Sequence, residues 1–208
     1  MNHGNFSPFY GDLIDPVSII TALEKFQKEG AQITDVVLCA AGGLDKYNKE
    51  KARGLDDKAA VEKARSYARM VNFEGPKIML GHLMKTFPTL NRFIYISSTS
   101  ASNFQPSTQH DPLSPYDELV AFYKYQFEKY LEDEAKNLKA KNIYPAIITA
   151  GTLQDTLIVQ RMREADPHAF LNSEEKFLTT WHVAAKVMKL LVSDPTTWGE
   201  YPKREKIG

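Results

Sequence analysis

The segment Phe93-Ile94-Tyr95-Ile96-Ser97-Ser98 is a short, continuous run of large apolar side chains that stops at a pair of serines. A run of this kind is typical of a strand that is buried on both faces of a parallel sheet. Residues 35–43 and 143–149 have the same character, and the first of these runs stops at a pair of glycines. These three segments are therefore the predicted core strands.

Long helical patterns separate the predicted strands. They cover residues 17–29, 56–87 and 116–141, and a break is predicted in the second at Gly75-Pro76. Residues 180–192 form a further predicted helix, because apolar side chains recur there every three or four residues. Strands that alternate with helices of this length predict an α/β fold, a doubly wound and mostly parallel sheet, in a single domain over residues 1–208.

Two segments are predicted to lie outside the regular elements. Residues 102–115 carry three prolines among polar side chains and are typical of a loop. Residues 157–178 are rich in charge, and we expect them to form a lid on the substrate side, over the carboxyl edge of the sheet.

The composition excludes several classes of function. Lys and Arg total 26, as do Asp and Glu, so no net charge would draw the protein to nucleic acid or to a membrane. No segment approaches the length of an apolar membrane span. Cys39 is the only cysteine, which suits a reducing compartment, so we expect a cytoplasmic protein. Cys39 and the five histidines lack the spacing of metal ligands, and no metal site is predicted.

A proton-transfer site is predicted from Ser98, Tyr125 and Lys129. Ligands of a doubly wound sheet bind where its strands end, and Ser98 ends one such strand. Tyr125 and Lys129 are four residues apart and therefore share a helix face. The lysine would lower the pKa of the tyrosine, which could then exchange a proton with a carbonyl or alcohol oxygen that Ser98 holds.

Spacing alone does not single out this pair. The chain has ten tyrosines, and the same Y-x-x-x-K spacing occurs at Tyr47 and Lys51. That second pair lies in a polar, charge-dense stretch, interpreted as the start of a loop, with no serine-ended strand before it. Tyr125 and Lys129 are preferred because of their surroundings.

Those surroundings resemble the short-chain dehydrogenase/reductase family from about Tyr10 to Glu200. The matching segments are, in order, Gly11–Pro16, Cys39–Gly42, Val71–Gly75, then Ser98 with Tyr125 and Lys129, and finally Ile148–Thr156, with Ala150 where proline is usual. The resemblance implies a Rossmann-like fold and an NAD- or NADP-dependent oxidoreductase that interconverts a small-molecule carbonyl and an alcohol.

The resemblance also assigns roles to residues. Asn72 would help to relay protons through a bound water, and Lys129 would also hold the nicotinamide ribose. The residues expected to contact the cofactor are Asp12, Leu13, Ala40, Ala41, Gly42, Lys129, Gly151 and Thr156. For Asn72 and Gly42 the alternatives are a bond to backbone at a helix kink and a tight turn.

Tyr116 is a competitor for the catalytic position. Ser114-Pro115-Tyr116 resembles a sequence motif in extended members of the family. In those members a lysine follows the tyrosine after four positions, but in this chain Val120 occupies that position. A site built on Tyr116 would lack its activator and would be degraded. Tyr125 is preferred because it keeps its lysine.

One part of the family pattern is missing from the sequence. Family members carry a glycine-rich strand-loop-helix before the aspartate loop, whereas eleven residues precede Asp12 and none of the eleven glycines forms such a motif. We therefore expect an N-terminally truncated fold with weakened dinucleotide binding. The alternative is a cofactor-impaired pseudoenzyme or partner subunit.

The missing unit also predicts an exposed apolar strand edge at residues 35–40. We expect a homo-oligomer or a partner chain to cover it. Residues 5–10 could instead lie beside that strand.

Overall fold

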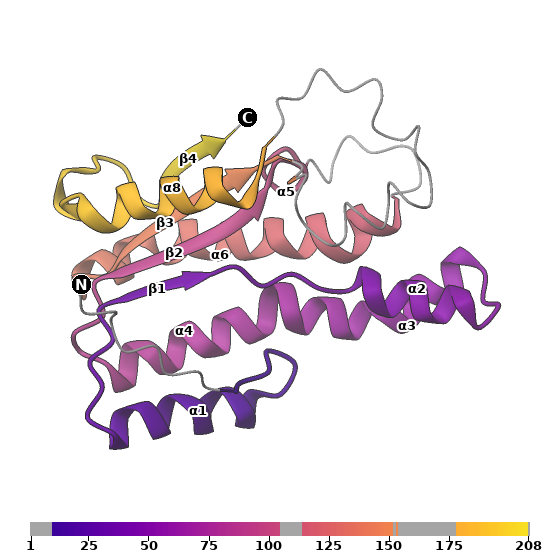
Figure 1. Ribbon diagram of the computed structural model, residues 1–208, viewed down its shortest axis with the longest axis horizontal. Helices are drawn as coiled ribbons and strands as arrows, with labels where there is room; N and C mark the ends of the chain where they lie inside the picture. The colour runs from indigo at the N-terminus through magenta and orange to yellow at the C-terminus, as the bar shows by residue number, and fades with distance from the viewer. Residues whose placement is uncertain (1–9, 105–113, 152, 154–177, 208) are drawn as a thin grey trace.

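The computed structural model describes residues 10–104, 114–151, 153 and 178–207. In this part of the chain four parallel strands form one sheet in the order β1-β2-β3-β4 (Figure 1). The strands are β1 (Asp35–Leu38), β2 (Arg92–Ser98), β3 (Tyr144–Ala150) and β4 (Lys203–Ile207). Leu38 pairs with Tyr95, and Ser98 pairs with Ala150, so the carboxyl ends of the strands lie at one edge.

Helices connect the strands. The α-helices are α1 (Pro16–Lys28), α2 (Leu44–Ala52), α3 (Asp57–Arg69), α4 (Gly75–Thr86), α5 (Thr99–Ser102), α6 (Phe122–Ala140) and α8 (Thr180–Val192). Two π-helical turns, η1 (Met70–Glu74) and η2 (Asp117–Ala121), lead into α4 and α6, and the 3₁₀ turn η3 (Pro195–Thr197) follows α8. The predicted α/β fold with a parallel sheet is therefore confirmed.

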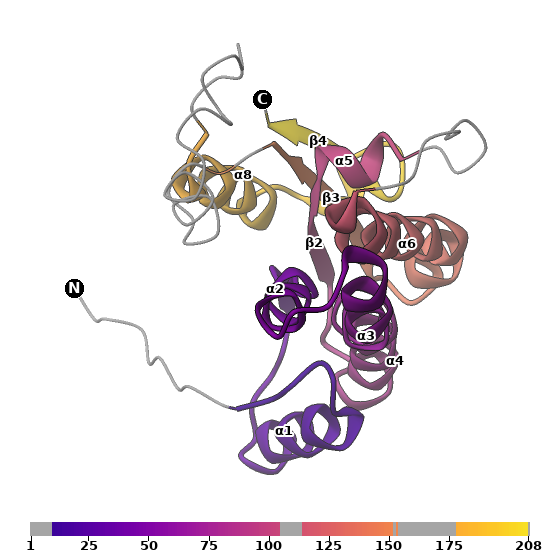
Figure 2. The same ribbon diagram turned by 90° about the vertical axis from the view of Figure 1, so that its right-hand side faces the viewer.

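The sheet separates two layers (Figure 2). Alternate residues of a strand point to opposite faces, and Phe93 and Tyr95 pack with α1, α4 and α6 on one side. Ile94 and Ile96 pack with α8 on the other side. Because β2 and β3 are covered on both faces, they read as uninterrupted apolar runs.

The elements that the sequence did not predict are polar. Residues 47–51 were interpreted as the start of a loop, but they belong to α2, which wraps charged side chains around the buried Glu50. Strand β4 alternates charged and half-buried side chains, as suits an edge strand. The predicted helix over 56–87 consists of α3, η1 and α4 without interruption, and its irregularity is the π turn at residues 70–74, directly before the predicted break at Gly75-Pro76.

The other edge of the described sheet is β1. Val37 in this strand is 37% exposed. The prediction that a homo-oligomer or partner chain covers the edge stays a prediction. Residues 5–9, and all of the proposed lid over 157–178 except Leu178, lie outside the described residues; Leu178 forms a bridge with Leu153. None of the helices in the described ranges combines the length and the hydrophobicity needed to span a bilayer.

Phe127 of α6 is central to the larger core cluster. It is fully buried, and its ring lies edge-on to Tyr95 with the centroids 4.8 Å apart. We expect Phe127→Ala to lower the free energy of unfolding by about 3–5 kcal/mol, because it removes buried area and leaves a cavity. Urea denaturation measures this change.

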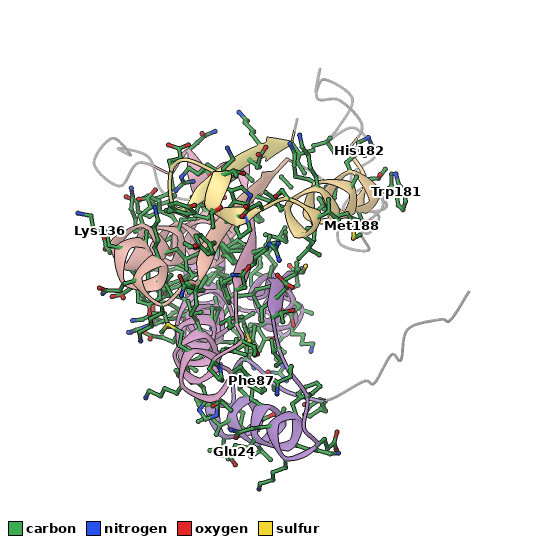
Figure 3. All side chains as sticks on the ribbon, turned by 90° about the vertical axis from the view of Figure 1, so that its left-hand side faces the viewer. Glu24, Phe87, Lys136, Trp181, His182 and Met188 are labelled. Atoms are coloured by element: carbon green, nitrogen blue, oxygen red, sulfur yellow. The ribbon has the colours of Figure 1, made fainter. Side chains whose placement is uncertain are left out.

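The matched control is Met188→Ala on the outer side of α8, where Met188 is 57% exposed (Figure 3). It should change the free energy of unfolding by no more than about 0.5 kcal/mol. Equal effects of the two substitutions would contradict the described packing of α6 on β2.

Candidate functional site

Ser98 and Tyr116 meet at the carboxyl end of β2. The Ser98 hydroxyl caps α5 by accepting a hydrogen bond from the Ala101 amide at 3.2 Å. The Ser98 hydroxyl lies near the phenol of Tyr116. Burial raises the pKa of Tyr116, and the Ser98 hydroxyl opposes this shift while Asp117 adds to it. Tyr116 therefore stays protonated at neutral pH and can donate its proton.

The local sequence sets the position of Tyr116. The Ser114 hydroxyl accepts from the Asp117 amide at 3.1 Å and donates to the Asp117 carboxylate at 2.7 Å, which starts the helix. Pro115 at the first turn fits this start. Val120, four residues after Tyr116, is 5% exposed and places no charge beside the phenol.

Lys124 lies further along α6 and is only 5% exposed. Its ammonium donates to the Ile96 carbonyl at 2.8 Å and to the Ala40 carbonyl at 3.4 Å. It also lies 4.9 Å from the centroid of the Tyr95 ring. Lys124 therefore links the segment after β1 to the carboxyl end of β2 through these two hydrogen bonds.

The surroundings of Lys124 shift its ionisation. Burial lowers the pKa of Lys124 to about 8, against an ordinary value of 10.5, and attraction to Glu128 and Cys39 opposes the shift. The ammonium is bonded to backbone carbonyls, and no carboxylate lies within ion-pair distance of it among the described residues. Such a group carries a cost in stability at neutral pH.

Tyr125 and Lys129 lie at a different place on α6. The Tyr125 ring centroid is 5.6 Å from that of Phe104, and the Lys129 ammonium is 5.7 Å from the Tyr125 ring centroid. Lys129 donates to Glu132 at 2.7 Å, a bond that raises the pKa of Lys129. Both residues line a cavity of about 420 Å³.

The structure thus divides the predicted triad. Ser98 lies near Tyr116, whereas Tyr125 and Lys129 line the cavity, and Ser98 and Tyr125 are not hydrogen-bonded to each other in the described part of the chain. The catalytic role of Tyr125 stays a prediction.

The cavity has a buried carboxylate in its wall. Glu128 is 1% exposed, and its Oε1 accepts from the hydroxyls of Ser97 at 2.5 Å and Ser102 at 2.9 Å. Its Oε2 accepts from Arg204 at 2.8 Å, and Ser102 lies 2.9 Å from the hydroxyl of Thr149. Sequence reasoning missed Lys124 and Glu128, although a charged pair at helical spacing beside buried aromatic residues was a signal for both.

Asn72 lies in η1 and is 1% exposed. Its Oδ1 accepts from the Gly42 amide at 3.2 Å. Its Nδ2 donates to the carbonyls of Gly42 at 2.7 Å and of Ala68 and Leu119 at 3.0 Å each. Both ends of the side chain are therefore engaged by backbone, which favours the structural alternative; the relay role stays a prediction.

Three of the predicted cofactor residues, Ala40, Ala41 and Gly42, follow the end of β1. Asp12 accepts from the Ile14 amide at 3.1 Å within a turn. The Leu13 carbonyl lies against Gly75, where a Cβ would come within 2.3 Å of it. Ala41 is exposed next to Ala40.

Gly151, at the end of β3, has its amide 3.4 Å from the Ile207 carbonyl. Thr156 lies outside the described residues.

These residues do not fit the pyrophosphate of a dinucleotide. A phosphate site needs backbone amides that are free to point at it. The Gly42 amide donates to Asn72 and the Gly43 amide donates to Asp45, so both glycine amides after β1 are used within the chain. Lys124, the nearest buried cation, is bonded to carbonyls.

Comparison with known proteins gives a fold. Neither family models nor characterised protein sequences match the chain. A short-chain type dehydrogenase/reductase from Mycobacterium ulcerans superposes on 95% of the chain with a TM-score of 0.66 and 17% identity. The chain has the fold of the short-chain dehydrogenases/reductases.

Two further structures with this fold are similar to the chain. The enoyl-acyl carrier protein reductase of Bacillus cereus, solved with NADP⁺, covers 99% of the chain at a TM-score of 0.65 and 16% identity. A variant of actinorhodin polyketide ketoreductase, solved with NADPH, covers 95% at a TM-score of 0.65 and 15% identity. The chain spans 66% of the length of the Mycobacterium ulcerans protein and 75% and 74% of the other two.

Asn72 is expected to be essential for stability. Asn72→Ala leaves the Gly42 amide and three carbonyls without this partner, so we expect a loss of about 2–4 kcal/mol in the free energy of unfolding. Urea denaturation measures the loss. Asn137→Ala, at an exposed position of α6, is the control and should stay within about 0.5 kcal/mol. A loss no larger than that of the control would contradict the structural role.

Lys124 predicts a pH dependence of stability. Its folded pKa is about 8 and its ordinary value is 10.5, so the unfolded chain binds the proton more strongly. The penalty is fully present below pH 8 and disappears as the pH rises toward 10.5. Relative to Lys124→Met, the natural protein should therefore gain about 1–3 kcal/mol between pH 7 and 10.

Urea denaturation of both proteins across this range measures the gain. Lys136→Met, on the exposed side of α6, is the control and should show a constant difference from the natural protein (Figure 3). A constant difference for Lys124→Met as well would show that its ammonium is not desolvated.

Proposed function

We propose that this chain is a short-chain-type oxidoreductase unit that acts on a small-molecule carbonyl or alcohol. Tyr116 is the acid/base and Ser98 holds the substrate oxygen. The observation that carries the proposal is the position of the buried Tyr116 phenol near the Ser98 hydroxyl at the carboxyl end of β2. This is the edge at which ligands bind in doubly wound sheets.

The proposed proton transfer follows from the protonation state of the Tyr116 phenol. In reduction, the neutral phenol donates its proton to the carbonyl oxygen, and the Ser98 hydroxyl stabilises the negative charge that develops there. In oxidation, the phenolate accepts the proton of the alcohol. Val120 leaves Tyr116 without a neighbouring cation, so the proton donor form is favoured over the base form at neutral pH.

The proposed hydride carrier is a nicotinamide dinucleotide. The similar structures solved with NADP⁺ and NADPH support NAD or NADP, which would supply or accept a hydride when bound. The described residues do not fit the pyrophosphate, because the amides after β1 are already bonded. We therefore expect weak binding of a free dinucleotide, and a chain without any binding would be the cofactor-impaired partner subunit.

The test is reduction of a panel of aldehydes and ketones at millimolar NADH or NADPH. We expect Tyr116→Phe to lower kcat/KM by about 100-fold or more, because the proton donor is lost. Ser98→Ala should lower it by about tenfold or more, because one hydrogen bond to the developing charge is lost.

Tyr125→Phe is the matched control on the same helix. Under the proposal it keeps kcat/KM within about threefold of the natural chain, whereas a large loss would assign the acid/base to Tyr125 and Lys129 instead. The absence of turnover and of cofactor binding by the natural chain would overturn the proposed activity.

A further inference from the structure

The cavity beside α6 has no role in the proposed function. Its volume is about 420 Å³, which lies within the usual range of small-molecule sites. It lies at the carboxyl edge of the sheet, between α5, α6 and the ends of β3 and β4. The described residues that line it include neither Ser98 nor Tyr116. The cavity is therefore a separate place at which a ligand can bind.

A buried carboxylate holds the floor of the cavity in one arrangement. Glu128 is 1% exposed and accepts hydrogen bonds from the hydroxyls of Ser97 and Ser102. It also accepts from the Arg204 guanidinium at 2.8 Å. Side chains that are already fixed by such bonds lose little freedom when a ligand binds, so this part of the cavity is preorganised.

The negative charges of Glu128 and Glu132 are balanced within the cavity wall. Arg204 bonds to both carboxylates, and the Lys129 ammonium donates to Glu132 at 2.7 Å. An ammonium has three N–H donors, and Lys129 uses one of them in this bond. Two carboxylates thus meet two cations, and Lys129 keeps donors that a ligand can use.

Lys206 adds a positive charge that no described carboxylate offsets. Its neighbour Glu205 is paired at 2.8 Å with Lys186 of α8. Lys206 is exposed and lines the cavity, and its ammonium makes neither a hydrogen bond nor an ion pair with the described residues. The wall therefore carries one positive charge in excess, which favours an anionic ligand.

The part of the wall around α5 is polar and uncharged. Thr99 and Asn103 line it, and within the described ranges their side chains make no hydrogen bond. The hydroxyls of Ser102 and Thr149 lie 2.9 Å apart beside them. Hydroxyl and amide groups both donate and accept, so this part of the wall suits the hydroxyl groups of a ligand.

We propose that the cavity binds a small sugar acid of the hexuronate type, a molecule with one carboxylate and several hydroxyl groups. The carboxylate accepts hydrogen bonds from the ammonium groups of Lys129 and Lys206. The hydroxyl groups bond to Thr99 and Asn103. The site does not depend on the proposed oxidoreductase activity.

The charge of the wall selects a carboxylate over the alternatives. A neutral sugar would leave the Lys206 ammonium without a partner. A phosphate group carries a charge of about −1.5 to −2 at neutral pH, so it would leave negative charge uncompensated near Glu132. One carboxylate matches the single excess charge.

The test is a calorimetric titration of the full chain with three sugars that differ only at the sixth carbon: glucuronate, glucose and glucose 6-phosphate. We expect saturable binding of glucuronate with a Kd below about 1 mM, and binding of the other two that is weaker by about tenfold or more. Equal or tighter binding of glucose or glucose 6-phosphate would overturn the ligand class. If none of the three binds saturably, the site itself is overturned.

Lys206→Met tests the position of the carboxylate. It should raise the Kd of glucuronate by about tenfold or more, because a hydrogen bond between two charged groups is lost. Lys203→Met is the matched control on β4, since Lys203 points to the other face of the strand and does not line the cavity.

The control should keep the Kd of glucuronate within about twofold of the natural chain, because an exposed charge outside the site is screened by salt. Equal losses in the two variants would show a general effect of charge and overturn the assignment of Lys206. The readout is binding, so its result is independent of any turnover at Ser98 and Tyr116.

Discussion

The amide of Asn72 is the interaction on which the site depends. It bonds to Gly42 after β1, to Ala68 at the end of α3 and to Leu119 in η2, so one side chain joins three segments far apart in the sequence. The π turn that contains Leu119 also sets the rotation of α6 relative to Tyr116. Among the described residues, Asn72 is the side chain that hydrogen-bonds both to this turn and to the segment after β1. A buried polar group with all of its bonds made specifies one arrangement in a way that apolar packing alone does not.

Much of the fold could be predicted because buried elements have characteristic patterns of apolar residues in the sequence. Strands β2 and β3 are covered on both faces and read as apolar runs, and α8 shows its buried face at helical spacing. Strand β4 could not be predicted, since Lys203 to Lys206 are charged and only packing against β3 holds them extended. Helix α2 was missed for a similar reason, because its one buried side chain is Glu50, which three basic residues surround.

Some residues of the candidate site were proposed from the sequence. Ser98 was proposed because a strand that ends in serines is visible in the sequence, and Tyr116 was weighed but placed second. The preference for Tyr125 rested on the spacing of Lys129, and that spacing assumes regular helix geometry. In the structure Tyr116, the tyrosine near Ser98, precedes an irregular turn, and the buried lysine of this helix is Lys124. Local irregularity of this kind depends on tertiary contacts such as that of Asn72 and leaves no signature in spacing.

The adjacent serines at the end of β2 have opposite orientations. Ser97 points with Tyr95 toward α6 and bonds to Glu128, whereas Ser98 caps α5 and lies near Tyr116. A slip of β2 by one residue would exchange the two hydroxyls and also turn its apolar side chains to the wrong layers. The alternation of side chains along β2 therefore fixes the position of the Ser98 hydroxyl near Tyr116, and it also directs the apolar side chains into the two core layers. A shift of β2 would therefore disturb the packing of the core and the positions of both serines at the same time.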